Sequence, residues 1–237
     1  MKHVAILISL ASGTLAAGAL AQAPGAHWST TPTPSDPPLR IENPGVSDGT
    51  HMYVFGGKAS SGVPLNDLWR FDGATWIQMT ASGAAGSPPE RFRSGVTWDT
   101  FRNRLVVFGG RDSSGTLLGD TWEWDPGTNT WADVTPTGTS PSPREFSALA
   151  FDLANGRVLL FAGLDATGAH LNDTWHFDGA AWTQLAPSTL PPVRRQHVLV
   201  ERPDFADVIL CGGQESGGAG HRADTWSWNG TAWTEIV

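Results

Sequence analysis

The most restrictive feature of this sequence is an internal repeat with a period of about fifty residues. The stretch NDLWRFDGATW at residues 66–76 returns as GDTWEWDPGTNTW at 119–131, NDTWHFDGAAW at 172–182 and ADTWSWNGTAW at 223–233. An apolar run precedes each copy, and the first small residue after each run stands at position 56, 109, 162 or 212. One supersecondary unit is therefore used four times, and single elements have to be interpreted within it.

Each repeat is expected to form four strands, which we label a to d. Residues 94–98 alternate in polarity as a half-buried strand a does, and residues 105–108 form the continuous apolar run of a strand b covered on both faces. In strand c, residues 69–71 place two aromatic side chains on one face. Asp72-Gly73 is the signal of a tight hairpin, and Trp76 opens strand d.

Features that recur in every repeat are explained by the construction of the unit, so function is sought in the positions that differ. The structural glycines are Gly56, Gly57, Gly109, Gly110, Gly163, Gly212 and Gly213. The structural tryptophans are Trp69, Trp76, Trp122, Trp131, Trp175, Trp182, Trp226 and Trp233. An aspartate before each strand c is expected to bind backbone donors. An arginine recurs after prolines at Arg40, Arg91, Arg144 and Arg195, and the last three are expected to form hydrogen bonds between units.

The glycine pair after an apolar strand, the aromatic pair, the Asp-Gly turn and the following tryptophan resemble kelch repeats. The variant looks like that of exported bacterial proteins in the galactose oxidase central domain-like superfamily, and the resemblance covers residues 28–237. It implies an all-β fold, a kelch-type β-propeller of four-stranded antiparallel blades. The propeller is expected over residues 40–237, with blades at about 40–84, 91–138, 144–188 and 195–237.

Residues 22–39 do not fit a propeller of four equal blades. Trp28 and the prolines after it resemble a strand d with its linker, although the fourth repeat already has its own strand d at 233–237. Pro44 also stands where strand a of the first repeat is expected. Three interpretations follow: a four-bladed ring that accommodates the orphan strand, a truncated propeller, or two chains that complete a larger ring as a homodimer.

The N-terminal residues 1–21 have the pattern of a signal peptide. Lys2 precedes an apolar run, and small residues allow cleavage after Ala21, or alternatively after Ala23. This predicts a secreted or periplasmic protein with no membrane attachment after cleavage, and a retained membrane anchor is the competing interpretation. The net charge of −8 argues against binding to nucleic acid or to anionic membranes.

The residue inventory argues against the enzyme classes that resemble this fold. A copper centre of the galactose oxidase kind needs two tyrosines, and Tyr53 is the only tyrosine of the chain. FDGATW resembles a sialidase aspartate box but lacks the residue between aspartate and glycine. The single cysteine, Cys211, takes the strand b position of Phe55 and Phe108 and is expected to be a core thiol. No metal site or cofactor is predicted, because the histidines show no metal-ligand spacing.

The positions that vary between repeats suggest a binding surface. Resemblance to ligand-binding kelch domains places Lys58, Arg93, Arg111, His197 and Gln214 on one rim of the propeller. The favoured function is an exported, non-catalytic binding or scaffolding module whose b–c loops contact a protein, a peptide or a carbohydrate. The alternatives are a carbohydrate-directed enzyme that uses Arg93, Arg195 or His197 on the propeller face, and a truncated propeller without independent function.

Overall fold

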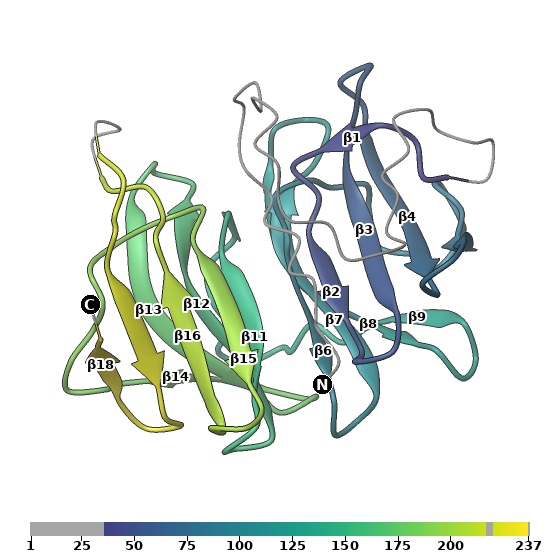
Figure 1. Cartoon of the computed structure of the whole chain (residues 1–237). Helices are drawn as coiled ribbons and strands as arrows, with labels where there is room; N and C mark the ends of the chain where they lie inside the picture. Colours follow the sequence, from purple (N-terminus) through teal and green to yellow (C-terminus); the bar gives the residue numbers. More distant parts are fainter. Residues whose placement is uncertain (1–35, 217–219, 237) are drawn as a thin grey trace, which may run out of the picture.

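The structure is a computed structural model that describes residues 36–216 and 220–236. Its strands form four antiparallel sheets, one for each copy of the repeat, and the described residues contain no helix. The sheets stand side by side around a common axis (Figure 1). The expected all-β propeller with four-stranded blades is therefore confirmed.

The strands follow the order a to d in each blade, with strand a divided in blades 1 and 3. Blade 1 contains β1 (Arg40–Ile41), β2 (Gly45–Ser47), β3 (Met52–Ala59), β4 (Pro64–Phe71) and β5 (Trp76–Thr80). Blade 2 contains β6 (Gly95–Asp99), β7 (Arg104–Arg111), β8 (Leu117–Asp125) and β9 (Thr130–Asp133). Blade 3 contains β10 (Arg144–Glu145), β11 (Ala148–Asp152), β12 (Arg157–Asp165), β13 (His170–Phe177) and β14 (Trp182–Leu185). Blade 4 contains β15 (Val198–Arg202), β16 (Asp207–Cys211), β17 (Thr225–Trp228) and β18 (Trp233–Glu235).

The core lies between the blades and is formed by the b strands and the tryptophans. Leu105 to Phe108 of β7 are all fully buried, as are Val158 to Phe161 of β12, which agrees with strands covered on both faces. One cluster joins strand b of blade 3 to Trp226, Trp228 and Trp233 of blade 4. Because blades 2 and 3 each bury both faces against a neighbouring sheet, the apolar pattern specifies the radial arrangement of the blades.

The glycine pair at the end of strand b creates a bulge that brings two blades together. In blade 2 the pairing of β7 with β8 shifts between Phe108 and Gly110, and both glycines of the pair have positive φ. A Cβ atom on Gly109 would stand 2.6 Å from the carbonyl oxygen of Arg144, in the next blade. Glycine is needed here because the backbone of the following blade occupies the space of a side chain.

Every blade contains one largely buried triad of arginine, aspartate and tryptophan, which we call the Arg–Asp–Trp triad. In blade 3, Arg144 donates to both carboxylate oxygens of Asp173, at 2.6 and 2.8 Å, and Trp175 Nε1 donates to the same carboxylate at 2.7 Å. Arg144 also donates to the carbonyl oxygen of Ala162 in strand b. The other triads are Arg40–Asp67–Trp69, Arg91–Asp120–Trp122 and Arg194–Asp224–Trp226.

The triads correct two predictions. The aspartates bind arginine and indole side chains, where backbone donors were expected, because the guanidinium reaches the strand entry from strand a. In blade 4 the arginine of the triad is Arg194, whereas Arg195 was expected in this role. The side chains of these arginines bond within their own blade, and it is the backbone that joins two blades: Arg91 N donates to Leu65 O at 3.0 Å, and Arg194 N donates to Leu171 O at 2.9 Å.

A second backbone connection, the axial ladder, runs from blade to blade near the axis. Its four residues lie two positions after the triad arginines and all have left-handed φ: Glu42, Arg93, Phe146 and Gln196. The amides of the last three each donate to the carbonyl oxygen of the ladder residue before, at 3.0, 2.9 and 3.4 Å. In the described part of the chain no such bond joins blade 4 back to blade 1.

Two further expectations concern the first and the last blade. Pro44 lies between β1 and β2, yet strand a of blade 3 is divided at the same place without a proline, so the left-handed residue at position 42 or 146 causes the break. Cys211 is exposed, so the prediction of a core thiol is wrong for the residues described. Within those residues no helix is long and apolar enough to cross a membrane.

Candidate functional site

A row of side chains with alternating charges crosses the rim of the propeller and joins blades 1 to 3. Lys58 lies 3.9 Å from Glu42, which accepts a 2.7 Å bond from Arg93 Nη2. Arg93 Nη1 then donates to Glu145 Oε2 at 3.0 Å. Arg111 binds the same Glu145 with two further bonds, at 2.9 and 3.0 Å. Residues from three blades thus share one network, and its hydrogen-bonded partners are 34 to 52 residues apart in sequence.

Glu145 is the centre of this network and is buried, with 2% of its surface exposed. Its burial raises the pKa of the carboxyl group, but the bonds from Arg111 and Arg93 outweigh that effect, so the pKa lies below its ordinary value. Glu145 is therefore a carboxylate at neutral pH. The side chains of Lys58, Arg93 and Arg111 are 26 to 29% exposed, so the cations face solvent above a buried anion.

An aromatic ring extends the site towards blade 4. The guanidinium carbon of Arg93 lies 4.5 Å from the ring centroid of Phe146, and that of Arg195 lies 5.5 Å from the same ring. Arg195 Nε also donates to Gln214 Oε1 at 2.8 Å. We call Lys58, Glu42, Arg93, Glu145, Arg111, Phe146 and Arg195 the rim cluster. It holds four cations and two carboxylates in a chain whose net charge is −8.

The structure brings most of the predicted binding residues together at the rim cluster but places one of them elsewhere. Lys58, Arg93 and Arg111 belong to the rim cluster, and Gln214 lies beside it through Arg195. His197 does not lie on the rim: it is 7% exposed and packs edge-on against Phe161, with ring centroids 5.5 Å apart. The prediction placed it there because Arg195 was counted as the recurrent arginine, and Gln196 occupies the equivalent position.

Glu145 was missed by the sequence prediction because its importance depends on contacts with two distant arginines. A signal was present, since the residues after the recurrent arginines are Ile41, Phe92, Glu145 and Arg195, with one acid among them. The described residues include no group of three or more histidine, cysteine, aspartate or glutamate side chains that could hold a metal ion. Tyr53 is buried and donates to Asp48.

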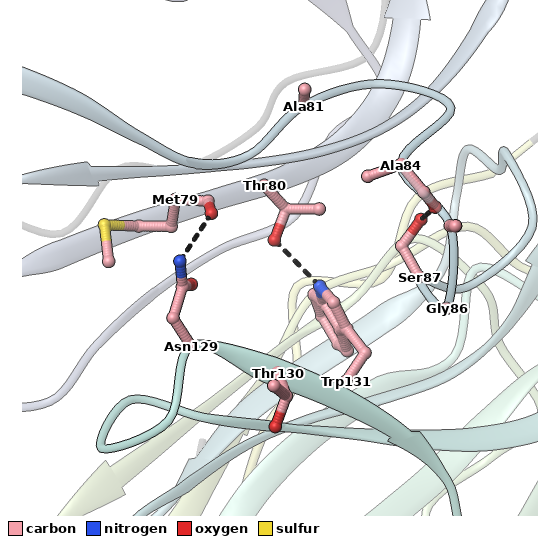
Figure 2. A pocket seen from close by; sticks show the side chains of 10 residues that line it. Met79, Thr80, Ala81, Ala84, Gly86, Ser87, Asn129, Thr130 and Trp131 are labelled. Atoms are coloured by element: carbon pink, nitrogen blue, oxygen red, sulfur yellow. Dashed lines mark hydrogen bonds between the residues drawn. The ribbon is translucent and has the colours of Figure 1, made fainter.

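A shallow cavity of about 310 Å³ lies between blades 1 and 2, away from the rim cluster. Figure 2 shows Trp131 and Asn129 of blade 2 reaching towards Thr80 and Met79 of blade 1. Trp131 Nε1 donates to Thr80 Oγ1 at 3.0 Å, and Asn129 Nδ2 donates to Met79 O at 3.1 Å. The polar groups of this cavity already join the two blades, so the rim cluster is the stronger candidate site.

Three relatives indicate what the chain is similar to. Dynein regulatory complex subunit 7 of Chlamydomonas reinhardtii is 35% identical over 118 residues, which cover 48% of this chain and 10% of the relative. Adagio-like protein 3 of Oryza sativa subsp. japonica is 32% identical over 72% of this chain and 28% of its own length. tRNA wybutosine-synthesizing protein 4 of Aspergillus fumigatus is 30% identical over 60% of this chain and 14% of its own length. The chain spans less than a third of each of these relatives.

These relatives contradict the predicted secreted or periplasmic location. One is named for a dynein regulatory complex, another is a plant Adagio-like protein, and neither name describes a secreted protein. The predicted signal peptide at residues 1–21 lies outside the described residues. One relative is named for a biosynthetic activity, but the match covers a small part of it. The chain matches the KLHDC2/KLHL20/DRC7 Kelch-repeats domain over residues 22–234, and it belongs to this family.

Proposed function

We propose that the chain is a non-catalytic protein-interaction module that binds an acidic segment of its partner on the rim cluster. The observation that carries the proposal is the excess of cations around one buried carboxylate. Lys58, Arg93 and Arg111 have exposed surface left after their bonds to Glu42 and Glu145. Kelch domains in dynein-associated and plant Adagio-like relatives support a role in interaction.

The geometry favours a carboxylate-bearing peptide over a neutral ligand. Arg93 and Arg111 are held in fixed orientations by Glu145, so their guanidinium groups are arranged before a ligand binds. Each Nη nitrogen of Arg93 and Arg111 makes one bond within the protein and keeps a second N–H, which can donate to a carboxylate of the partner. The ring of Phe146 between Arg93 and Arg195 offers an apolar surface for a side chain next to the acid.

A carbohydrate-directed enzyme is less well supported. That alternative requires Arg93, Arg195 or His197 on the propeller face, and His197 is buried between blades 3 and 4. The carboxylates of the rim cluster are occupied by arginine donors, which stabilise the ionised form and do not favour a general acid.

The test measures the affinity of purified protein for an array of acidic peptides and for the same peptides with glutamine in place of glutamate. We expect binding to acidic sequences that weakens several-fold from 50 to 300 mM salt, because the contacts are partly exposed. Arg111→Ala should weaken binding about tenfold, which corresponds to roughly 1.4 kcal/mol.

Arg104→Ala is the matched control, because Arg104 forms a similarly exposed ion pair with Asp125 outside the rim. Equal binding of the acidic and the glutamine peptides would contradict the proposal. So would equal losses in the Arg111 and Arg104 variants.

A further inference from the structure

The rim cluster occupies one end of the propeller, and a second cavity lies at the other end, among the turns that connect strands a and b. This a–b cavity measures about 350 Å³, and residues in or beside the a–b turn of every blade line it: Ser47, Asp48, Gly49, Thr100, Leu153, Glu201, Arg202, Pro203 and Asp207. Strand b separates the two ends, since β7 runs from Arg104 beside its turn to Arg111 at the rim (Figure 1). Its 8 residues span roughly 25 Å, so the a–b cavity and the rim cluster are distinct sites.

Three of the four charged residues that line the a–b cavity already have partners. Asp48 accepts a 2.9 Å bond from the hydroxyl of Tyr53, and Arg202 Nε donates to Asp207 at 2.8 Å. The fourth is Glu201, whose carboxyl group receives no hydrogen bond or ion pair from the residues that the structure describes. Burial raises the pKa of Glu201, and neither a bond nor a charge offsets the effect. A cation that enters the cavity would give this carboxyl group the partner that it lacks.

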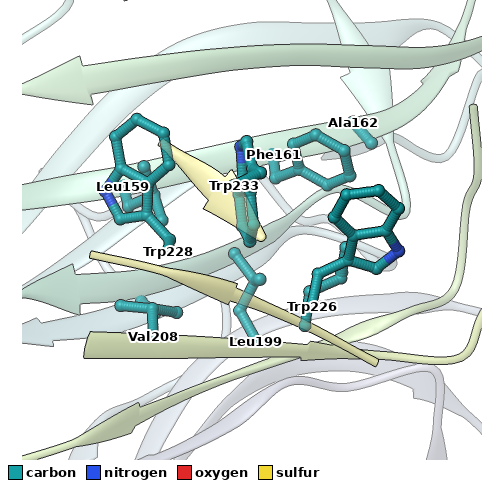
Figure 3. Packing of buried hydrophobic residues seen from close by; sticks show 10 residues of the cluster. Leu159, Phe161, Ala162, Leu199, Val208, Trp226, Trp228 and Trp233 are labelled. Atoms are coloured by element: carbon teal, nitrogen blue, oxygen red, sulfur yellow. The ribbon is translucent and has the colours of Figure 1, made fainter. Parts of the chain in front are cut away.

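The core of blade 4 holds Glu201 in place. Glu201 lies on β15 directly opposite Val208 of β16 and two residues after Leu199, so the three side chains share one face of the sheet. Figure 3 shows Leu199 and Val208 in a buried cluster with Trp228. The carboxyl group therefore lies at the edge of an apolar core, which explains its desolvation and places it on a rigid strand.

Two phenylalanines of the a–b turns expose their rings on the same end of the propeller. Phe101 in blade 2 is 63% exposed and Phe205 in blade 4 is 70% exposed. Each ring has one contact that orients it: Phe101 packs edge-on against Phe151 at 5.1 Å, and the guanidinium carbon of Arg202 lies 4.4 Å from the centroid of Phe205. Every other phenylalanine, tryptophan or tyrosine in the described residues is mostly buried. Exposed aromatic rings on either side of a cavity are typical of an interface.

We propose that the a–b cavity is a second docking surface, which takes an arginine or lysine side chain from a basic segment of a protein partner. The basic group pairs with Glu201, and apolar residues beside it in the segment pack on Phe101 and Phe205. A protein segment fits better than a free amine, because the two rings belong to different blades and only a ligand that extends beyond the cavity contacts both. The charge preference is opposite to that of the rim cluster, and the two surfaces act independently.

The test measures the binding of a fluorescently labelled peptide, with one arginine between leucines, to the full chain by fluorescence anisotropy. We expect saturable binding that falls about tenfold or more when glutamine replaces the arginine of the peptide. Glu201→Gln should weaken the arginine peptide about tenfold without lowering the Tm, because it removes a desolvated charge that has no partner. Asp204→Asn is the matched control: it removes the same charge from an exposed position of the same turn and should leave the affinity unchanged.

A second variant, Phe205→Ser, tests the surface at a mostly exposed side chain, where the fold is little affected. It should weaken the arginine peptide several-fold and leave the weaker binding of arginine amide unchanged. Equal binding of the arginine and glutamine peptides, or equal losses in Glu201→Gln and Asp204→Asn, would overturn the proposal. Arginine amide that binds as tightly as the peptide would overturn it in favour of a free amine. Self-association in light scattering that is lost in Phe205→Ser would overturn it in favour of a second copy.

Discussion

The Arg–Asp–Trp triads and the rim cluster use the same chemistry, arginine against carboxylate, for different ends. A triad is present in all four blades, and the arginines of blades 2 to 4 are at most 1% exposed. The rim cluster occurs once, draws its residues from several blades and keeps its cations partly in solvent. The comparison teaches that recurrence identifies the scaffold of a repeat protein, whereas an arrangement that breaks the repeat identifies its candidate site.

The largest expected effect comes from breaking a triad. Arg144→Met removes two bonds to Asp173 and leaves a partly buried carboxylate without its cation. The cost should be about 3–5 kcal/mol in the free energy of unfolding, because an unpaired buried charge is penalised. Urea unfolding followed by tryptophan fluorescence measures it. A loss below about 1 kcal/mol would show that the triads are no more important than surface ion pairs.

Lowering the pH should destabilise the folded scaffold through one buried histidine, His197. Burial, and then the charge of Arg194, lower the pKa of His197 to about 3. Below its ordinary pKa of 6.5 the unfolded chain binds a proton that the folded chain does not, so stability falls as the pH falls from 6.5 towards 3. The contribution at pH 5 is on the order of 2 kcal/mol.

The His197→Ser variant carries a serine at position 197. Blades 2 and 3 have a serine at the equivalent position, Ser94 and Ser147. Unfolding curves between pH 7 and 5 should be less pH-dependent in this variant than in the unchanged protein. His170, whose pKa is also lowered by burial, remains in both proteins and does not affect the difference. Identical slopes would contradict the assignment.

A smaller effect is expected from a single bond between blades. Thr174→Val keeps the shape of a fully buried side chain but leaves Trp233 Nε1 without its acceptor. The expected loss is about 1 kcal/mol, measured by thermal unfolding. Thr183→Val, at an exposed position of β14, serves as the control and should change stability by less than about 0.5 kcal/mol.

The smallest expected effect on stability lies at the rim. Lys58→Ala breaks a 3.9 Å contact with Glu42 and should change the free energy of unfolding by less than about 0.5 kcal/mol. The same change should still weaken the binding of acidic peptides, measured by fluorescence anisotropy. If stability fell while binding stayed constant, Lys58 would belong to the scaffold.

Much of the fold could be predicted because its determinants are local. The tight turn at Asp72-Gly73, the glycine pairs and the apolar b strands each act within a few residues and are repeated four times. The choice between Arg194 and Arg195 could not be made from sequence, because both give a nearly even spacing and the decision depends on which side chain reaches Asp224. Because of that one-residue difference, His197 was predicted on the rim, whereas it lies in the interface between blades 3 and 4.

The candidate site was predicted in part for a related physical reason. Lys58, Arg93 and Arg111 could be selected as polar residues at variable positions, but Glu145, which arranges the arginines, contacts them across 34 and 52 residues of sequence. The exposure of Cys211 has a different origin. The burial of strand b in one blade depends on whatever follows it around the ring, and a residue pattern inside the blade contains no information about that neighbour.

The axial ladder of Glu42, Arg93, Phe146 and Gln196 has a consequence for how such a domain can change. Their main-chain bonds join the blades whatever side chain each position carries, and the side chains present are an acid, a base, an aromatic ring and an amide. Assembly of the ring therefore places little restriction on the chemistry of four positions that surround one axis. A new binding specificity can be grafted there, by evolution or by design, while the framework that holds it stays the same.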